Sequence, residues 1–168
     1  MGATYLRFHT QSAQILDSAR IKTITGATAA NPVVISSTAH GLSNGDEVFI
    51  SSVAGMTELN GRNFLIANVA ANSFELQDLN GNNVDGTGYT AYTSGGTATP
   101  PYEVTDPWAA ADLFDIKYAQ SGDVMTLCHP SYTAQQLVRI ANDSWALEGL
   151  SLSPTIHYNW GYHGDNTE

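Results

Sequence analysis

The chain has 168 residues, of which 42% are hydrophobic and only 13% are charged, so it is long enough and apolar enough to bury a core. Its richness in Gly, Ser, Thr and Asn favours a turn-rich, mainly β protein over a helical one. The formal charge of −10, with six Lys and Arg against 16 Asp and Glu, argues against nucleic acid as a direct ligand, and no window approaches the ~20 apolar residues of a membrane span.

Residues 1–20 contain one strand candidate, the run "TYLRF" at Thr4–Phe8. The first residues lack the basic start and the long apolar region of a secretory signal, so we expect no cleaved export signal. This short segment differs in composition from residues 21–99, and we assign it to a host domain that resumes at residue 100.

Residues 21–99 form a module rich in Thr, Ala, Asn, Gly and Val. Five short runs carry β-branched or aromatic residues at about period two, and turn sequences such as "GLSNG", "TELNG" and "NGNNVDGTG" separate them. The runs are "NPVVISS", "DEVFISSV", "NFLIANVA", "SFELQDL" and "YTAYTSGGTAT". An open sheet of this size would leave two long edges free to aggregate, so we predict a small β-barrel of five to six strands.

The stretch "STAHGLSNGDEVFISSV" places His40 six residues before Asp46, at the start of a strand. One histidine and one carboxylate across a turn are weak evidence for a general base or a ligand. We expect His40 to cap or pack the turn, Gly41 and Gly45 to supply unusual backbone angles, and Asp46 to bind turn amides.

Residues 100–154 complete the host domain, and we predict that residues 21–99 are inserted into it. "YEV" after a Pro pair is a strand candidate, and "DPWAAADLFDIKYAQ" predicts a short helix over Ala109–Leu113 with Asp106 as its cap. "SGDVMTLCHPSY" indicates a turn and a strand, "AQQLVRIAND" a strand or a short helix, and "SWALEGLSL" a closing strand. Residues 155–168 form an aromatic C-terminal segment of what we expect to be a longer protein.

Catalytic and metal-binding patterns are weak throughout. Cys128 is the single cysteine, which excludes an internal disulfide; we predict a buried side chain there, and His129 next to it would point to the opposite face of a strand. The acid pairs Asp112 with Asp115 and Asp143 with Glu148 lie in no glycosidase motif. The spacing of three potential ligands matches no strong metal pattern: His157, His163 and Asp165. We therefore predict no catalytic residue, no metal, no cofactor and no enzymatic activity.

Residues 100–147 carry a motif that resembles structural proteins of tailed bacteriophages and prophages. The family pattern reads Pro-Tyr-Glu, an acidic "ADL", "YAQSGDVM", "HP" with an aromatic residue, "L-x-R" and a closing Trp, after an earlier "YLRF" strand. The matching positions are Tyr5–Phe8, Pro101, Tyr102, Glu103, Ala111–Leu113, Tyr118–Met125, His129, Pro130, Tyr132, Leu137, Arg139 and Trp145. The resemblance implies a virion protein made in the cytoplasm of a bacterial host.

The segment "HGLSNGDEVFISSVAGMTELNGRNF", His40–Phe64, is similar to the small β-barrel of the first catalytic cysteine half-domain of ubiquitin-activating enzymes, which recurs in phage virion proteins. The adenylation and thioester machinery of those enzymes lies outside this barrel. The resemblance therefore implies a fold and no ubiquitin chemistry.

These resemblances imply a non-enzymatic virion structural protein of the tail or the head-tail region, acting through contacts with other virion proteins and as a homo-oligomer in the particle. Exposed aromatic residues are costly unless a partner covers them, so we predict contacts at Trp108, Phe114, Tyr158, Trp160 and Tyr162. The alternative is a host-surface or glycan-binding module of a phage tail, in which Tyr, Trp and His side chains stack on sugars.

Overall fold

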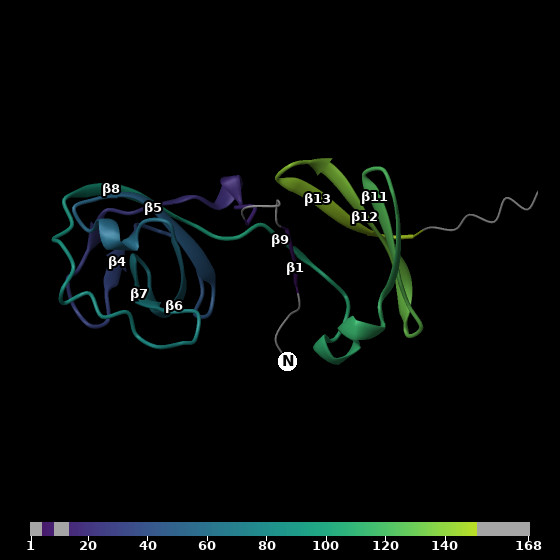
Figure 1. Cartoon of the computed structure of the whole chain (residues 1–168), viewed down its shortest axis with the longest axis horizontal. Coiled ribbons are helices and arrows are strands. Elements are labelled where there is room, and N and C mark those ends of the chain that lie inside the picture. Colours follow the sequence, from purple (N-terminus) through teal and green to yellow (C-terminus); the bar gives the residue numbers. More distant parts are fainter. Residues whose placement is uncertain (1–4, 9–13, 151–168) are drawn as a thin grey trace, which may run out of the picture.

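The computed structural model describes residues 5–8 and 14–150, and these form two β-rich lobes with a short ribbon between them (Figure 1). The prediction of a mainly β fold is confirmed. The strands are β1 (Tyr5–Arg7), β2 (Lys22–Thr23), β3 (Gly26–Ala27), β4 (Val34–Ser36), β5 (Glu47–Ala54), β6 (Arg62–Ala70), β7 (Ser73–Gln77), β8 (Ser94–Thr99), β9 (Glu103–Thr105), β10 (Lys117–Ser121), β11 (Val124–His129), β12 (Tyr132–Ala141) and β13 (Ser144–Gly149). Three short 3₁₀-helices accompany them: η1 (Ser18–Arg20), η2 (Thr57–Leu59) and η3 (Ala110–Asp115).

The first lobe is a seven-stranded sheet in the order β2-β8-β5-β6-β7-β4-β3. By this order the sheet is open, with β2 and β3 at its two edges. Only Ile24 and Thr25 separate these edge strands in the chain, and their amides donate to the carbonyls of Gly96 and Ser36, at 2.9 and 2.8 Å. One extended segment, residues 22–27, therefore borders both ends of the sheet, and the lobe curls around a single core. The sheet has seven strands where five to six were predicted, and its strand order is not that of a closed barrel.

That core is built from the inward-facing residues of the strands. In β7 the pattern alternates strictly, with Phe74 and Leu76 fully buried and their neighbours half-buried, as period two requires. Val48 and Ile50 of β5 are completely buried as well. The full buried cluster is Ile24, Val33, Ile35, Leu42, Val48, Ile50, Val53, Met56, Leu59, Phe64, Ile66, Phe74, Leu76, Val84 and Ala98.

A two-stranded ribbon links the lobes. Its strands β1 and β9 pair antiparallel although the whole first lobe separates them in sequence, with Arg7 opposite Glu103. This pairing is compatible with a barrel inserted between the two halves of a host domain, whereas the boundaries at residues 20, 99 and 154 stay a prediction.

The second lobe is an antiparallel meander in the order β10-β11-β12-β13, with hairpin connections between neighbours. The run "AQQLVRIAND", left open as strand or helix, is part of β12. The small core on one face of this sheet centres on Trp108, Leu127 and Leu137. Leu6, Phe8, Ile116, Met125, Tyr132, Trp145 and Leu147 pack against it.

Two burial predictions and one helix prediction need correction. Cys128 is exposed, because its side chain lies on the face of the sheet opposite the core. Trp108 is 3% exposed, because Asp106 accepts a hydrogen bond from its amide and the turn directs the indole into the second core. The predicted helix is the 3₁₀-helix η3, and its N-cap residue is Ala109, with no side-chain cap.

Candidate functional site

The turn around His40, which leads into β5, is a structural feature. His40 is 1% exposed and its ring meets Phe74 edge-on, with centroids 5.1 Å apart. Nδ1 accepts from the Leu42 amide at 3.1 Å, so Nε2 carries the hydrogen and donates to the Ala70 carbonyl at 2.8 Å. Both ring nitrogens are used within the fold, which confirms the expectation of a packed turn.

The rest of the turn also follows the sequence prediction. Gly41 and Gly45 have φ values of +63° and +89°, which residues with a Cβ rarely adopt. Asp46 accepts from the Ser43 amide at 2.9 Å, so it binds a turn amide as expected. The side chains of His40 and Asp46 therefore serve the structure of the turn.

The predicted contact residues separate into three groups. Phe114 is 95% exposed at the end of η3, so it is available to a partner. Trp108 belongs to the second core and is not a surface residue. Tyr158, Trp160 and Tyr162 lie outside the described residues.

Phe114 stands beside an uncovered edge strand. All five residues of β10 are exposed, and Tyr118 within it is 72% exposed. η3 is tied to the sheet at one point, because Tyr132 Oη donates to Asp112 at 2.7 Å and accepts from the Ala109 amide at 3.2 Å. The carboxylate holds the phenolic hydrogen and raises the pKa of Tyr132. Phe114 is thus an apolar side chain on a short helix anchored by Tyr132.

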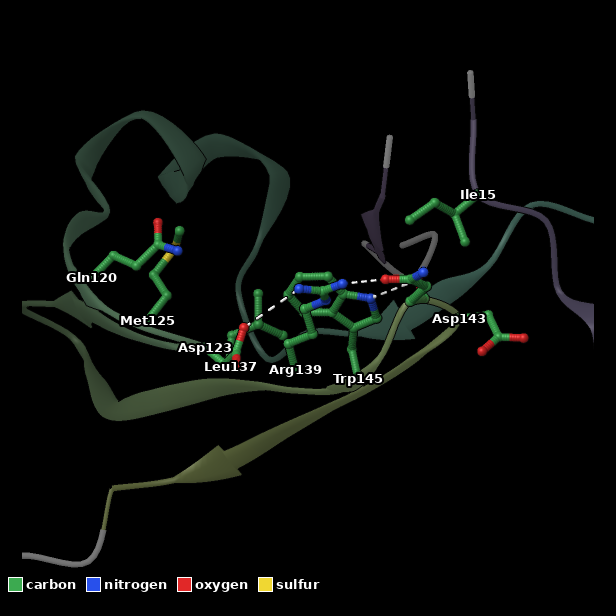
Figure 2. Close-up of a pocket in the computed structure, with 9 residues that line it drawn as sticks. Ile15, Gln120, Asp123, Met125, Leu137, Arg139, Asp143 and Trp145 are labelled. Atoms are coloured by element: carbon green, nitrogen blue, oxygen red, sulfur yellow. Dashed lines mark hydrogen bonds and ion pairs between the residues drawn. The ribbon is translucent and has the colours of Figure 1, made fainter. Parts of the chain in front are cut away.

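A pocket of about 780 Å³ opens at the other end of the same sheet, where the turns of β10–β11 and β12–β13 lie (Figure 2). Its lining combines apolar and polar groups: Ile15, Gln120, Asp123, Met125, Leu137, Arg139, Asn142, Asp143 and Trp145. A volume in this range accommodates a small ligand or a side chain of a partner.

Arg139 and Trp145 organise the pocket. Figure 2 shows the guanidinium reaching across the indole, with its carbon 5.9 Å from the ring centroid. Arg139 also contacts Asp123 at 3.5 Å and donates to the Asn142 side chain. Phe8 stacks on Trp145, with centroids 4.5 Å apart and planes 20° apart, so one face of the indole is already covered. The pocket offers donors and acceptors above an apolar floor.

No reaction chemistry emerges from the other candidates. Asp112 accepts from Tyr132, and Asp143 accepts from Ser18 at 2.9 Å, so one acid of each pair is engaged in a hydrogen bond within the fold. His129 Nδ1 accepts a hydrogen bond from the Ser131 amide, so this ring nitrogen is used in the turn. Within residues 5–8 and 14–150, no group of three or more His, Cys, Asp or Glu side chains is placed to hold a metal ion. No helix in those ranges is long and apolar enough to cross a membrane.

Comparison with known families identifies the first lobe. Residues 31–100 match the model of the ubiquitin-activating enzyme E1 FCCH domain. This match agrees with the resemblance carried by His40–Phe64 and covers β4 to β8, the greater part of what we now call the FCCH-like lobe. A comparison with curated proteins finds no match. The FCCH-like lobe accounts for a fold, and the pocket and Phe114 lie outside it in the second lobe.

Sequence reasoning missed the pocket although it named most of the residues that line it. Arg139 and Trp145 were noted only as parts of a motif. The additional signal was the position of Asp123 and Asn142 in the two turn sequences "SGD" and "AND", which flank strands of one meander. Hairpin pairing brings these two turns to the same end of the sheet, so a register assignment would have placed their side chains together.

Proposed function

We propose that this chain is a non-enzymatic structural protein of a phage or prophage virion, in the tail or head-tail region, which acts through protein contacts during assembly. The observation that carries the proposal is Phe114, an aromatic side chain 95% exposed beside the exposed edge strand β10. Exposed aromatic surface is costly in water and is typical of interfaces.

Three further features support this proposal. The pattern in residues 100–147 resembles virion proteins, and the described residues carry no assembled catalytic constellation. The FCCH-like lobe has a densely packed core and hydrogen-bonded turns, which suit a stable exterior. Its match is to one domain of an enzyme whose chemistry resides elsewhere, so it adds no activity here.

Particle composition tests the proposal directly. Induced particles from the source bacterium are purified and their proteins identified by peptide mass spectrometry. We expect peptides of this chain in the same fractions as major capsid and tail proteins. Their absence from particles that contain those proteins contradicts the proposal.

A contact test addresses the surface. The Phe114→Ser variant is compared with the wild type for binding to dissociated particle proteins. Leu79→Ser is the matched control, because Leu79 is 56% exposed in the other lobe. We expect weaker binding only for Phe114→Ser. Equal binding by all three proteins excludes Phe114 as a contact.

The pocket favours a second candidate, a glycan-binding module of a phage tail. Arg139, Asp123 and Asn142 supply donors and acceptors suited to sugar hydroxyls, above the apolar Met125 and Leu137. A glycan array with wild type, with Gln120→Trp to fill the pocket, and with Tyr158, Trp160 and Tyr162 changed to Ala separates the possibilities. Dose-dependent binding lost in either variant favours recognition of glycans, and its absence favours the structural role.

A further inference from the structure

The four-stranded sheet of the second lobe has one covered face and one open face. Met125, Leu137 and Leu147 lie side by side on the covered face, where Trp108 and its neighbours pack. Residues one position away along each strand point to the other side. There the polar Ser121 and Gln136 lie among side chains that are small or β-branched and are paired across the strands: Ala119, Val124, Thr126, Cys128, Val138 and Ala146. We call these six residues the open face.

The open face consists of small, mostly apolar residues with Ser121 and Gln136 between them, and the cores of the described chain do not cover it. None of its six residues belongs to either buried cluster or to the residues packed against one. Ala119 and Cys128 are exposed, and Val124, Thr126, Val138 and Ala146 are half-buried. Figure 1 shows the ribbon β1–β9 and the connection to β10 on the side of the sheet that faces the FCCH-like lobe. A flat surface of this composition suits packing against a second sheet.

One positive and one negative side chain lie at opposite edges of the open face, so the face can pair with a second copy of itself. Lys117 lies at one edge, on β10, in the row of Cys128. Glu148 lies at the opposite edge, on β13, in the row formed by Gln136, Thr126 and Ala119. Both side chains are exposed and share the side of the open face. These rows are two residues apart along the strands, about 7 Å, which a lysine side chain can span.

We propose that the open face packs on the open face of a second copy of this chain, related by a two-fold axis parallel to the strands. Such an axis places β10 of one copy over β13 of the other, so Lys117 faces Glu148 of the second copy and the reverse contact forms at the other edge. The proposal rests on the proposed function, since it names one of the contacts that assembly would use.

Sedimentation tests the dimer. The intact wild-type chain is expected to show a concentration-dependent dimer. Ala119→Arg puts a charge into the contact at an exposed residue of the edge strand β10, and we expect at least roughly ten-fold weaker dimerisation. Circular dichroism checks that the variant is folded. A wild type that stays monomeric at hundreds of micromolar overturns the proposal, as does a dimer that Ala119→Arg leaves unchanged.

Charge exchange tests the orientation. Lys117→Glu and Glu148→Lys each place like charges together and are expected to weaken the dimer, whereas the double variant restores the pairs and recovers most of the affinity. Lys22→Glu is the control, because Lys22 lies on β2 in the FCCH-like lobe. Two weakened single variants without recovery in the double variant overturn the two-fold arrangement.

The single cysteine provides an independent readout. Cys128 lies within the open face, and two sheets packed about 10 Å apart bring the two thiols within reach of a short bis-maleimide linker. We expect covalent dimers from the wild type and few from Ala119→Arg. Absence of cross-linking in a solution where sedimentation shows dimers places the contact elsewhere and overturns the proposal. If self-association fails while particle proteins still bind, the proposed function stands without this contact.

Discussion

Arg7 of the ribbon and Glu47 of the FCCH-like lobe form an ion pair, with Nη1 2.5 Å from Oε2. Arg7 also donates through Nε to Glu103 at 2.6 Å, and Glu47 accepts at its other oxygen from Asn63 at 2.6 Å. Glu47 is 8% exposed, so its carboxylate depends on these partners for the hydrogen bonds that water would otherwise supply. The pair joins β1 and β9 to β5 and fixes the ribbon against the FCCH-like lobe.

Replacing Arg7 by Met keeps much of the side-chain volume and removes the charge. We expect a loss of about 1–3 kcal/mol in the free energy of unfolding, because Glu47 stays largely buried without its cation. Urea denaturation measures the change. Arg20→Met is the control: Arg20 lies 3.9 Å from Asp46 in an exposed pair, so its loss should cost under about 1 kcal/mol. Equal effects of the two variants would show that the Arg7 bridge has no special role.

Replacing His40 by Ala removes two hydrogen bonds and the edge contact with Phe74. We expect a destabilisation of about 2–4 kcal/mol, from the cavity and from the unpaired Leu42 amide and Ala70 carbonyl. Thermal unfolding measures it. His129→Ala is the matched control, because His129 also makes an aromatic edge contact, with Tyr132, but is half-buried and has its hydrogen bond with a local turn amide. A stable His40→Ala variant would refute the packing role.

The strands were predictable where turn residues and period-two runs coincide. The Asn-Gly turns and the alternation in "SFELQ" located β7 and its neighbours closely. The run beginning at Tyr89 was placed too early, since β8 starts at Ser94. Tyr92 lies before this strand, and its hydroxyl donates to the carbonyl of Ile24, which is distant in sequence, and to that of Gly95, which is near. The alternation of residue types along the chain does not predict such hydrogen bonds.

Burial was harder to predict in the second lobe. Cys128 and Trp108 were assigned by residue type and by neighbouring polarity, and both assignments were wrong. Their exposure depends on which face of the sheet receives the cover from residues 5–8 and from the turn at Asp106, and this is a property of the tertiary fold. The position of the pocket likewise depends on hairpin register. Phe114 was predicted to be exposed, and it lies between acidic residues on the surface.

Replacing Gly55 by Ala should strain the FCCH-like lobe. Its φ is +85°, and an added Cβ would lie 2.1 Å from the Ala91 carbonyl oxygen. Because the obstacle is backbone, the strand β5 or the loop before β8 must move, and we expect a destabilisation of at least about 1 kcal/mol. Gly81→Ala is the control, since its φ is also +85° but nothing lies within 4 Å of the added atom. If chemical denaturation gives both variants the same free energy of unfolding, the contact with Ala91 is unimportant.

Acid should destabilise the loops of the FCCH-like lobe. The Thr90 amide bonds to Glu58 and lowers the pKa of that carboxyl. The side chain of Asn82 lowers the pKa of Asp78, and the Thr87 amide lowers that of Asp85. A carboxyl whose pKa is lower in the folded state contributes stability above its unfolded value, and this stability is lost as the pH falls through the folded value.

We therefore expect the free energy of unfolding to decrease as the pH is lowered beneath about 4, where these carboxyl groups ordinarily titrate. Urea denaturation between neutral and acidic pH measures the slope. Glu58→Gln should reduce that slope, whereas Asp115→Asn should leave it unchanged, because the exposed Asp115 carboxylate accepts no such loop amide within the described residues. A slope that is the same in wild type and in Glu58→Gln would remove Glu58 from the explanation.

Tyr132→Phe should release η3 from the sheet while preserving the ring that packs on the second core. The hydroxyl holds Asp112 and the Ala109 amide, so without it residues 110–115 lose their anchor and Phe114 its fixed position. Faster amide hydrogen exchange over residues 109–115, with little change in β11 and β12, is the expected result.

In the wild type the same release should occur in alkali. Because Asp112 raises the pKa of Tyr132 in the folded state, the stabilisation is complete below the ordinary tyrosine value near 10 and is lost as the pH rises through the raised value. Exchange in this segment that is equal in wild type and Tyr132→Phe at neutral pH would show that the hydroxyl does not position Phe114.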